Sequence, residues 1–492
     1  MSGNGNGAPT FRFQRYQALA ETRHEILAEF RDVADSLDTG DFRANRMGML
    51  GGSGGPPVLG ESIRSAIETG SRNLVSLSSL DNRIRELVKE GYGDEWDGVA
   101  VATAEGGLWV TFEALVAPPM AVRGIKYLTS FITPLERHSH HQAAYGAPFP
   151  PWLKDHIADR GVTAGELGMM AKRSENVRAV FVPLAGARYE CHGIKYHPAF
   201  LLLSTDASAS AAKIRTTAHR HLDNLSAVVS MGYDTPGYGY RDKGSNGTPA
   251  LQHALGELAA ELDIPYIVDN ARGTPFLGLD PRQVGASVVI YSTDKAFGGP
   301  TGGLIIGKEE FMVPIRRALG VHGNRWGTTG SHGKAGYVMV DPGKEALLGI
   351  IAALENVLRR PALLTEPVKP LFDLARAIAS EELGELAESL TISSSDNSLA
   401  IEINYENTWH TDSPIPIFPI EDYYSGANLI QYGMAGAGVS PPLCYDANIV
   451  VGPLSNMCEA EGVLSEARAE FALRTMFRGI KRLTERFNRT PS

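Results

Sequence analysis

The fold is decided by residues 291–307, which read YSTDKAFGGPTGGLIIG. An apolar run from Ser287 to Tyr291 leads into this segment. Lys295 follows four residues after the end of that run, and a glycine-rich turn then precedes a second apolar run. Short apolar runs bounded by glycine are typical of buried strands. In an open α/β sheet ligands collect at the carboxyl ends of the strands, so Ser292 and Lys295 are candidate site residues.

The segments before this stretch alternate between helix and strand. A helix is expected from Pro249 to Leu262, where apolar residues recur every three or four positions, with Thr248 as N-cap and Pro249 as first helical residue. Strands are expected at residues 98–103, 226–231, 264–268 and 287–291, with further candidates at 177–184 and 201–204. This order predicts an α/β fold whose mostly parallel sheet is covered on both faces.

Three regions are expected along the chain. Residues 1–57 form an N-terminal arm, with a helix at 11–35 and a Gly- and Pro-rich hinge at 51–57; residues 58–338 form the large domain; and residues 339–492 form a smaller C-terminal α/β domain. The second boundary is placed just before an amphipathic helix at 342–358. Beyond it we expect helix to about residue 388, strands at 399–403 and 449–451, and a final helix at 459–487.

Composition restricts the class of protein. The chain has 492 residues and a formal charge of −10, and its sequence contains no run of lysine or arginine. Proteins that bind many phosphates normally present a basic face, so nucleic acid is not an expected partner. The 3 cysteines are widely spaced and form neither a disulfide framework nor a metal motif. The first residues do not resemble a secretory signal and no stretch is long and apolar enough to span a membrane, so a cytoplasmic enzyme is expected.

Several residues that follow strands suit a pyridoxal phosphate site. Asp269 ends one strand, and a buried carboxylate there can hold the pyridine nitrogen protonated by charge pairing. The amine of Lys295 can bind the cofactor aldehyde as a Schiff base. Thr103, Gly106 and Gly107 lie where the first strand turns into a helix, and the N–H groups of a helix N-terminus bind phosphate. Ser292 can add a hydroxyl to the same site.

Residues 291–307 resemble the active-site lysine segment of bacterial selenocysteine synthase (L-seryl-tRNA selenium transferase) and its relatives. In that family Ser-x-Asp-Lys precedes Gly-Gly-Pro and a glycine-bounded apolar strand. Asp269 stands 26 residues before Lys295, where fold-type I pyridoxal phosphate enzymes place the aspartate of the ring nitrogen. Residues 343–355 are similar to the helix that follows the lysine, so the resemblance covers roughly residues 100–360. It implies the aspartate aminotransferase-like fold and a homodimer or higher homo-oligomer.

Residues 138–144, HSHHQAA, look like the His-Ser-x-x-Lys-Ala element of the same fold. The resemblance implies that His138 stacks on the cofactor ring and that His140 or His141 is available for proton transfer. A metal cluster is the alternative for these histidines. No Glu-x-x-His or Cys-x-x-Cys motif accompanies them, and we therefore expect no metal.

The residue that binds a substrate carboxylate is not evident from the C-terminal region, because no arginine occurs between Arg376 and Arg468. Arg272, just beyond Asp269, and Arg325, in a Gly-rich stretch, are the candidates for this role. A surface charge is the alternative for both.

The resemblance implies an enzyme that acts at the α-carbon of a small or nucleoside-linked α-amino acid. One version is an oxygen-using monooxygenase-decarboxylase that forms a carboxamide, as in the biosynthesis of capuramycin-type nucleoside antibiotics. A second is β-elimination or β-replacement on a serine-like substrate. A third is a binding protein of the same fold that has lost catalysis, against which the presence of both Lys295 and Asp269 argues.

Overall fold

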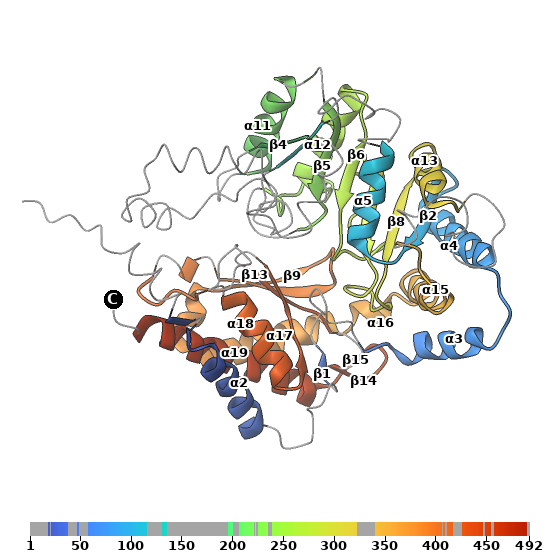
Figure 1. The fold of residues 1–492 in the computed structure, drawn as a ribbon. Helices are drawn as coiled ribbons and strands as arrows, with labels where there is room; N and C mark the ends of the chain where they lie inside the picture. Colours follow the sequence, from blue (N-terminus) through green and yellow to red (C-terminus); the bar gives the residue numbers. More distant parts are fainter. Residues whose placement is uncertain are drawn as a thin grey trace, which may run out of the picture.

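The structure is a computed structural model. It describes residues 18–19, 21–37, 47–48, 58–115, 130–134, 195–199, 206–220, 222, 225–234, 239–321, 340–405, 407–408, 411–416, 426–445, 448–453 and 457–489. The described elements form a large α/β unit and a C-terminal α/β unit (Figure 1), and the two units do not share an apolar core.

The large unit is built on a seven-stranded sheet in the order β2-β8-β7-β6-β5-β3-β4. Its strands are β2 (Trp96–Val101), β3 (Ser130–Pro134), β4 (Lys195–Ala199), β5 (Leu225–Met231), β6 (Tyr266–Asp269), β7 (Val288–Ser292) and β8 (Gly303–Lys308). Only β8 runs antiparallel to its neighbours; every other pair in this sheet is parallel. The mostly parallel sheet expected from the sequence is thus confirmed.

Alternate residues of these strands face two different apolar cores, as the period of a strand requires. Val268 and Val289 pack with helices α3 (Glu61–Ser71), α4 (Leu77–Tyr92), α11 (Ala207–His219), α12 (Ala250–Glu261) and α15 (Lys344–Arg359). Ile267 and Ile290 pack on the opposite face with helices α5 (Ala104–Leu115) and α13 (Glu309–Leu319). Burial on both faces explains why the strands are apolar throughout rather than alternating.

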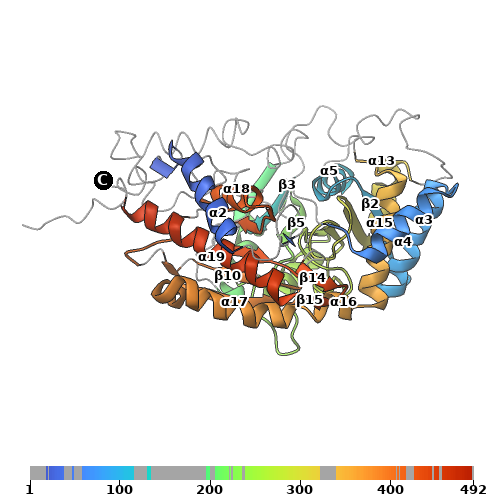
Figure 2. The ribbon, with the colours of Figure 1, turned by 90° about the horizontal axis from the view of Figure 1, so that it is seen from below.

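Helix α15 belongs to the large unit, and this corrects the expected boundary at residue 339. Leu347, Ile350 and Leu354 are buried in the same core as the sheet, and α15 packs against α3 and α4 (Figure 2). The amphipathic pattern was identified from the sequence, but the pattern does not state which core its apolar face joins. Core packing changes after α16 (Ala362–Thr365), where α17 (Val368–Leu383) joins the C-terminal core.

The C-terminal unit is a four-stranded antiparallel sheet in the order β12-β13-β10-β9, covered by helices. Its strands are β9 (Thr391–Ser395), β10 (Ala400–Asn404), β12 (Leu443–Tyr445) and β13 (Asn448–Val451), and its helices are α17, α18 (Gly426–Gly436) and α19 (Glu466–Arg489). Helix α2 (Arg23–Leu37) of the N-terminal arm packs on α18 and α19 in both views (Figures 1 and 2). Phe30 of α2 is buried in the C-terminal core, so this part of the arm is integral to that unit.

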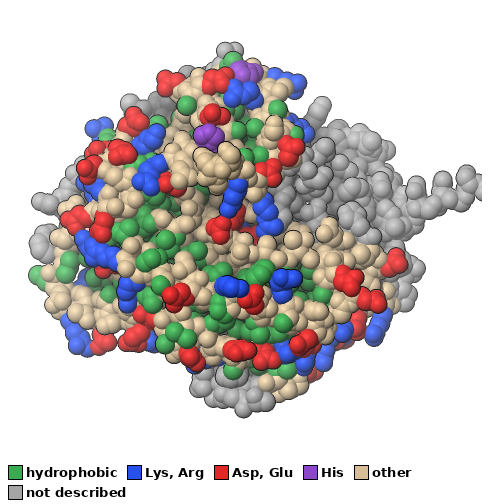
Figure 3. Space-filling view, turned by 180° about the vertical axis from the view of Figure 1, so that it is seen from behind, with side chains coloured by type: hydrophobic (Ala, Val, Ile, Leu, Met, Phe, Trp, Pro, Cys, Tyr) green, Lys and Arg blue, Asp and Glu red, His purple; other side chains and the backbone are tan. Residues whose placement is uncertain are grey.

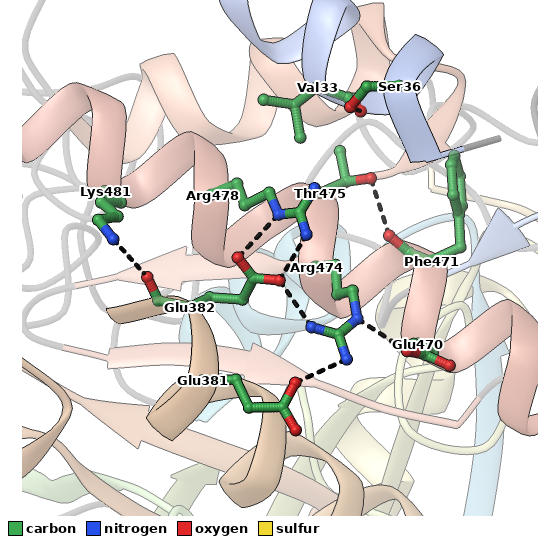
Figure 4. A network of polar contacts seen from close by, with 10 residues as sticks. All are labelled: Val33, Ser36, Glu381, Glu382, Glu470, Phe471, Arg474, Thr475, Arg478 and Lys481. Carbon is green, nitrogen blue, oxygen red and sulfur yellow. Dashed lines mark hydrogen bonds and ion pairs between the residues drawn. The ribbon is translucent and has the colours of Figure 1, made fainter. Parts of the chain in front are cut away.

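An ion-pair network joins α17 to α19 (Figure 4). The carboxylate of Glu382 accepts hydrogen bonds from Arg474 at 2.6 Å and from Arg478 at 2.7 and 2.9 Å. Arg474 also donates to Glu381 and Glu470. The hydrogen bonds from Arg478, followed by those from Arg474, hold the pKa of Glu382 below its usual value.

The expected elements agree with the structure in type and differ at some ends. The helix expected from Pro249 starts one residue later, with Pro249 itself in the N-cap position instead of Thr248. The final helix starts at Glu466 because residues before it form the hairpin of β14 (Cys458–Ala460) and β15 (Val463–Leu464). Strands expected at 177–184 and 201–204 lie outside the described residues. Within the described part, no helix has the length and apolar character needed to cross a membrane.

Candidate functional site

The carboxyl ends of four parallel strands meet along one edge of the large sheet. Ser292 of β7 pairs with Gly303 of β8, which in turn pairs with Val101 of β2. On the other side of β7, Asp269 of β6 pairs with Ile290 and with Met231 of β5. Neighbouring strands lie about 4.8 Å apart, so the residues that follow β2, β7, β6 and β5 lie along the same edge of the sheet, within the dimensions of one ligand-binding site. Lys295, Asp269 and Thr103 all come from these strand ends.

Asp269 is the last residue of β6 and is buried, with 1% of its surface exposed. Its Oδ1 accepts a hydrogen bond of 3.2 Å from the N–H of Ala271. Strand alternation places Asp269 on the same face as Ile267, which is the face covered by α5. The buried carboxylate therefore lies on the side of the sheet where the N-terminus of α5 is found.

The lysine segment is a closed loop rather than an extended strand end. Three hydrogen bonds of Thr293 close the loop. Its N–H donates to Gly302 O at 3.0 Å, and its carbonyl accepts from Gly299 N–H at 2.7 Å. Its hydroxyl donates to Pro300 O. Lys295 is half-buried within this loop. The hydroxyl of Ser292 donates to Oδ1 of Asp294 at 2.6 Å, so it is engaged inside the segment. Its predicted contact with a phosphate stays a prediction.

The glycines after the lysine allow the loop to approach Thr103. A Cβ on Gly303 would lie 2.4 Å from the carbonyl oxygen of Thr103, and a Cβ on Gly302 would lie 2.8 Å from Oγ1 of Thr293. No side chain fits at these distances. The Gly-Gly before Leu304 therefore explains how the lysine loop and the start of α5 come together.

Thr103 acts as the N-cap of α5. Its Oγ1 accepts from Gly106 N–H at 3.0 Å and its carbonyl accepts from Gly107 N–H at 3.0 Å. The absence of side chains at these glycines also serves packing, because a Cβ on Gly106 would lie 2.6 Å from Val340. A phosphate at this helix end is chemically reasonable. Direct contacts between a phosphate and the N–H groups of Gly106 and Gly107 stay predictions. Both N–H groups donate to Thr103 in this structure, so they would have to donate to the phosphate instead of Thr103 or to both.

Arg272 is fully buried and forms an ion pair with Glu402 of β10, with 2.7 Å between Nη2 and Oε1. Its guanidinium carbon lies 4.1 Å from the centroid of the Tyr233 ring. Burial raises the pKa of Glu402, and the positive charge of Arg272 opposes that rise. The substrate-binding role expected for Arg272 stays a prediction, and in this structure Glu402 provides the carboxylate that it binds.

The turn between β9 and β10 contacts the loops after β5 and β6. Asn397 exchanges two side-chain hydrogen bonds with Asn270, at 2.7 and 3.1 Å. Oδ1 of Asp234, which follows β5, accepts from the hydroxyl of Ser395 at 2.6 Å, and its Oδ2 accepts from the N–H of Asp396 at 2.9 Å. The C-terminal unit therefore covers the strand ends that carry the site.

The remaining site residues expected from the sequence, His138, His140, His141 and Arg325, lie outside the described residues. In the described ranges there is no cluster of three or more His, Cys, Asp or Glu side chains suited to a metal ion. In the described part of the chain, Lys295, Asp269 and Thr103 lie at the carboxyl ends of β7, β6 and β2, along one edge of the large sheet.

Sequence reasoning missed Asn397 and Glu402, which both come from the C-terminal unit. A signal existed for Glu402, since it stands between Ile401 and Ile403 in a strand buried along its whole length. A charged residue at such a position normally has a buried partner. For Asn397 there was no comparable signal, because asparagine in a turn is ordinary.

Comparisons with known proteins give a partial match in sequence and a match in fold. No protein-family model matches the chain. The L-seryl-tRNA(Sec) selenium transferase of Salmonella arizonae is 30% identical over 134 residues, a match that covers 24% of this chain and 27% of that protein. The same enzyme from Salmonella paratyphi B is 29% identical over 134 residues, with the same coverage. This chain is therefore matched to only about a quarter of these relatives' length.

Among solved structures, the complex of SepCysS with the N-terminal domain of SepCysE superimposes with a TM-score of 0.50 at 10% identity, covering 89% of this chain and 95% of that chain. An alanine–glyoxylate aminotransferase from Nostoc sp. has a TM-score of 0.49 at 11% identity, covering 91% of this chain and 97% of that chain. The chain has the fold-type I, aspartate aminotransferase-like architecture, with one antiparallel strand in an otherwise parallel sheet.

Proposed function

We propose that this chain is a pyridoxal phosphate-dependent enzyme that acts at the α-carbon of a small or nucleoside-linked α-amino acid. One observation supports the proposal above all: Asp269 ends β6 and the loop of Lys295 follows the adjacent strand β7, at the carboxyl edge of a fold-type I sheet. The local likeness to the selenium transferase of Salmonella arizonae is consistent with it.

The residues present fit the cofactor. Bound pyridoxal phosphate supplies an aldehyde that reacts with amines and a ring that stores the electron pair released when a bond at the α-carbon breaks. Lys295 would bind the aldehyde carbon through Nζ, and its amine would then move the proton at the substrate α-carbon. The buried side chain of Asp269 would keep the ring nitrogen protonated by charge pairing. Thr103 and the N-terminus of α5 would bind the phosphate.

A free or nucleoside-linked amino acid suits this chain better than an aminoacyl-tRNA. The formal charge is −10, and on the face seen in Figure 3 acidic and basic side chains are interspersed rather than separated into patches. Binding of a nucleic acid normally relies on a basic surface whose affinity falls steeply with salt. A gel-shift titration with total tRNA should therefore show no submicromolar, salt-resistant complex.

The proposal is tested by adding pyridoxal phosphate to the purified protein and screening amino acids by visible absorption and product mass. Cofactor binding followed by amino-acid-dependent spectral change supports it. A wild-type protein that binds no pyridoxal phosphate contradicts it.

The reaction type is distinguished by running the same screen with and without oxygen. We propose an oxygen-using decarboxylation that leaves a carboxamide, in which case oxygen uptake and carbon dioxide release are stoichiometric. The alternative is β-elimination or β-replacement on a serine-like substrate, which the partial match to the selenium transferase favours. That reaction would proceed without oxygen and release the β-substituent.

A further inference from the structure

We infer that two residues of the C-terminal unit, Asn397 and Glu402, are positioning residues for Asp269. The inference rests on the proposed function, because it concerns the carboxylate proposed to bind the ring nitrogen. Both residues contact the turn that begins with Asp269, and both contacts join the C-terminal unit to the large unit.

The first contact is a reciprocal amide pair. Nδ2 of Asn397 donates to Oδ1 of Asn270 at 2.7 Å, and Nδ2 of Asn270 donates to Oδ1 of Asn397 at 3.1 Å. Both side chains are buried, with 4% and 0% exposed. Asn397 Oδ1 also accepts from Leu279 N–H at 3.0 Å, and its carbonyl accepts from Thr274 N–H at 2.8 Å. Asn397 thus satisfies polar groups of the large unit in the segment that follows Asp269 in the chain.

The second contact is the Arg272–Glu402 ion pair, in which both side chains are fully buried. Glu402 lies in the middle of β10, which is paired on both sides by β9 and β13. The strand is therefore a rigid support for the carboxylate. Arg272 is three residues after Asp269, so the pair fixes the far end of the same short turn.

The two contacts hold alternate residues of the turn. Asn270 and Arg272 contact the C-terminal unit. Ala271, which lies between them, links the turn to the lysine segment, because its carbonyl accepts a hydrogen bond from Ser292 N–H at 3.1 Å. The N–H of Ala271 also donates to Asp269. A shift of this turn would consequently move the Asp269 carboxylate and the start of the lysine segment together.

A glycine on each side leaves Asn270 little freedom to shift. A Cβ on Gly232 would lie 2.6 Å from the Asn270 side chain, and a Cβ on Gly273 would lie 2.2 Å from it. The amide is therefore enclosed by backbone on two sides and by Asn397 on a third. When Asn397 is removed, Asn270 loses its side-chain hydrogen bonds with the C-terminal unit.

The test compares Asn397→Ser and Glu402→Gln with Asn404→Ser in the full-length protein. Asn404 is a matched control: it is a buried asparagine of β10 whose Nδ2 donates to Asn448 Oδ1 at 3.0 Å, wholly within the C-terminal sheet. Each variant is titrated with pyridoxal phosphate, and its thermal unfolding and the visible spectrum of the bound cofactor are recorded. Glu402→Gln keeps the shape of the side chain, and Asn397→Ser is an independent variant if Glu402→Gln does not fold.

We expect Asn397→Ser and Glu402→Gln to bind the cofactor at least about fivefold more weakly, the change that one net hydrogen bond is worth, and to alter its visible spectrum. Asn404→Ser should lose stability but keep the wild-type affinity and spectrum. The inference is overturned if the affinities and spectra of all three variants match the wild type while stability falls. Failure of the wild type to bind pyridoxal phosphate would contradict the proposed function instead.

Discussion

The guanidinium of Arg272 and the carboxylate of Glu402 form an ion pair of 2.7 Å across the boundary between the two units, with both side chains removed from water. Each charge alone would be very unfavourable in that position. The pair therefore couples the turn after Asp269 to the C-terminal sheet.

Replacing Arg272 by methionine should destabilise the protein by about 3–5 kcal/mol, because the Glu402 charge would be left buried without its partner. Urea unfolding measures the loss. The double variant Arg272→Met/Glu402→Met should recover much of it, since no charge then remains buried. Additive losses in the double variant would show that the two side chains do not stabilise one another.

Replacing Glu382 by glutamine should lower the free energy of unfolding at pH 7 by about 1 kcal/mol, because the hydrogen-bonded carboxylate of α17 loses its charge. Arg478 and Arg474 lower the folded-state pKa of Glu382 below 4.5, so its contribution is complete above the unfolded pKa and is lost as pH falls through the folded one. The difference between wild type and variant should shrink accordingly below pH 4.5.

Glu385 is exposed, and Glu385→Gln is the matched control for Glu382→Gln. The free energy of unfolding of Glu385→Gln should differ little from that of the wild type at pH 7 and at acid pH. Urea unfolding at pH 7 and at acid pH measures both variants. A Glu382→Gln effect that stays constant with pH would mean that the ion pairs in Figure 4 contribute nothing through charge.

Cys444 and Cys458 should resist alkylation by iodoacetamide at pH 8 in the native protein. Both thiols are buried; burial raises the pKa of Cys444, and it raises the pKa of Cys458 to about 11. About one Cys458 side chain in a thousand is then a thiolate at pH 8. Cys458 lines a cavity of about 70 Å³ next to Phe297 of the lysine loop. Peptide mapping by mass spectrometry gives the answer, with urea-unfolded protein as the control; rapid native labelling of either residue would contradict the packing.

The sequence predicted β2, β5, β6 and β7 of the large unit because their signals are local, and it did not predict β3 or β4. Buried strands that run apolar from end to end, and a lysine loop rich in glycine, depend on residues close together in the chain. The placement of α15 failed for the opposite reason. Its apolar stripe is equally compatible with either core, and only its contacts with α3 and α4 decide between them.

The candidate site also has a part that the sequence predicted and a part that it did not. Asp269, Lys295 and Thr103 follow strands, so their meeting at one sheet edge could be predicted from strand order. Asn397 and Glu402 contact the turn after Asp269 from a different unit, more than a hundred residues away along the chain. No spacing rule connects such residues, and their contacts depend on how two separate cores pack together.

Replacing Asp269 by asparagine should leave the protein folded and able to bind pyridoxal phosphate, but with most activity lost. An amide is similar in shape to the carboxylate but cannot stabilise a protonated ring nitrogen. Turnover of the best substrate and the circular dichroism spectrum should be measured together. Near-normal turnover would show that another group pairs with the ring nitrogen.

Lys295 is the residue proposed to bind the cofactor. Borohydride reduction of the protein loaded with pyridoxal phosphate, followed by peptide mass spectrometry, tests it most directly, with Lys295→Ala as the control. We expect a phosphopyridoxyl group on Lys295 in the wild type and no stoichiometric label in the variant. Stoichiometric label on a different lysine, or none in the wild type, would contradict it.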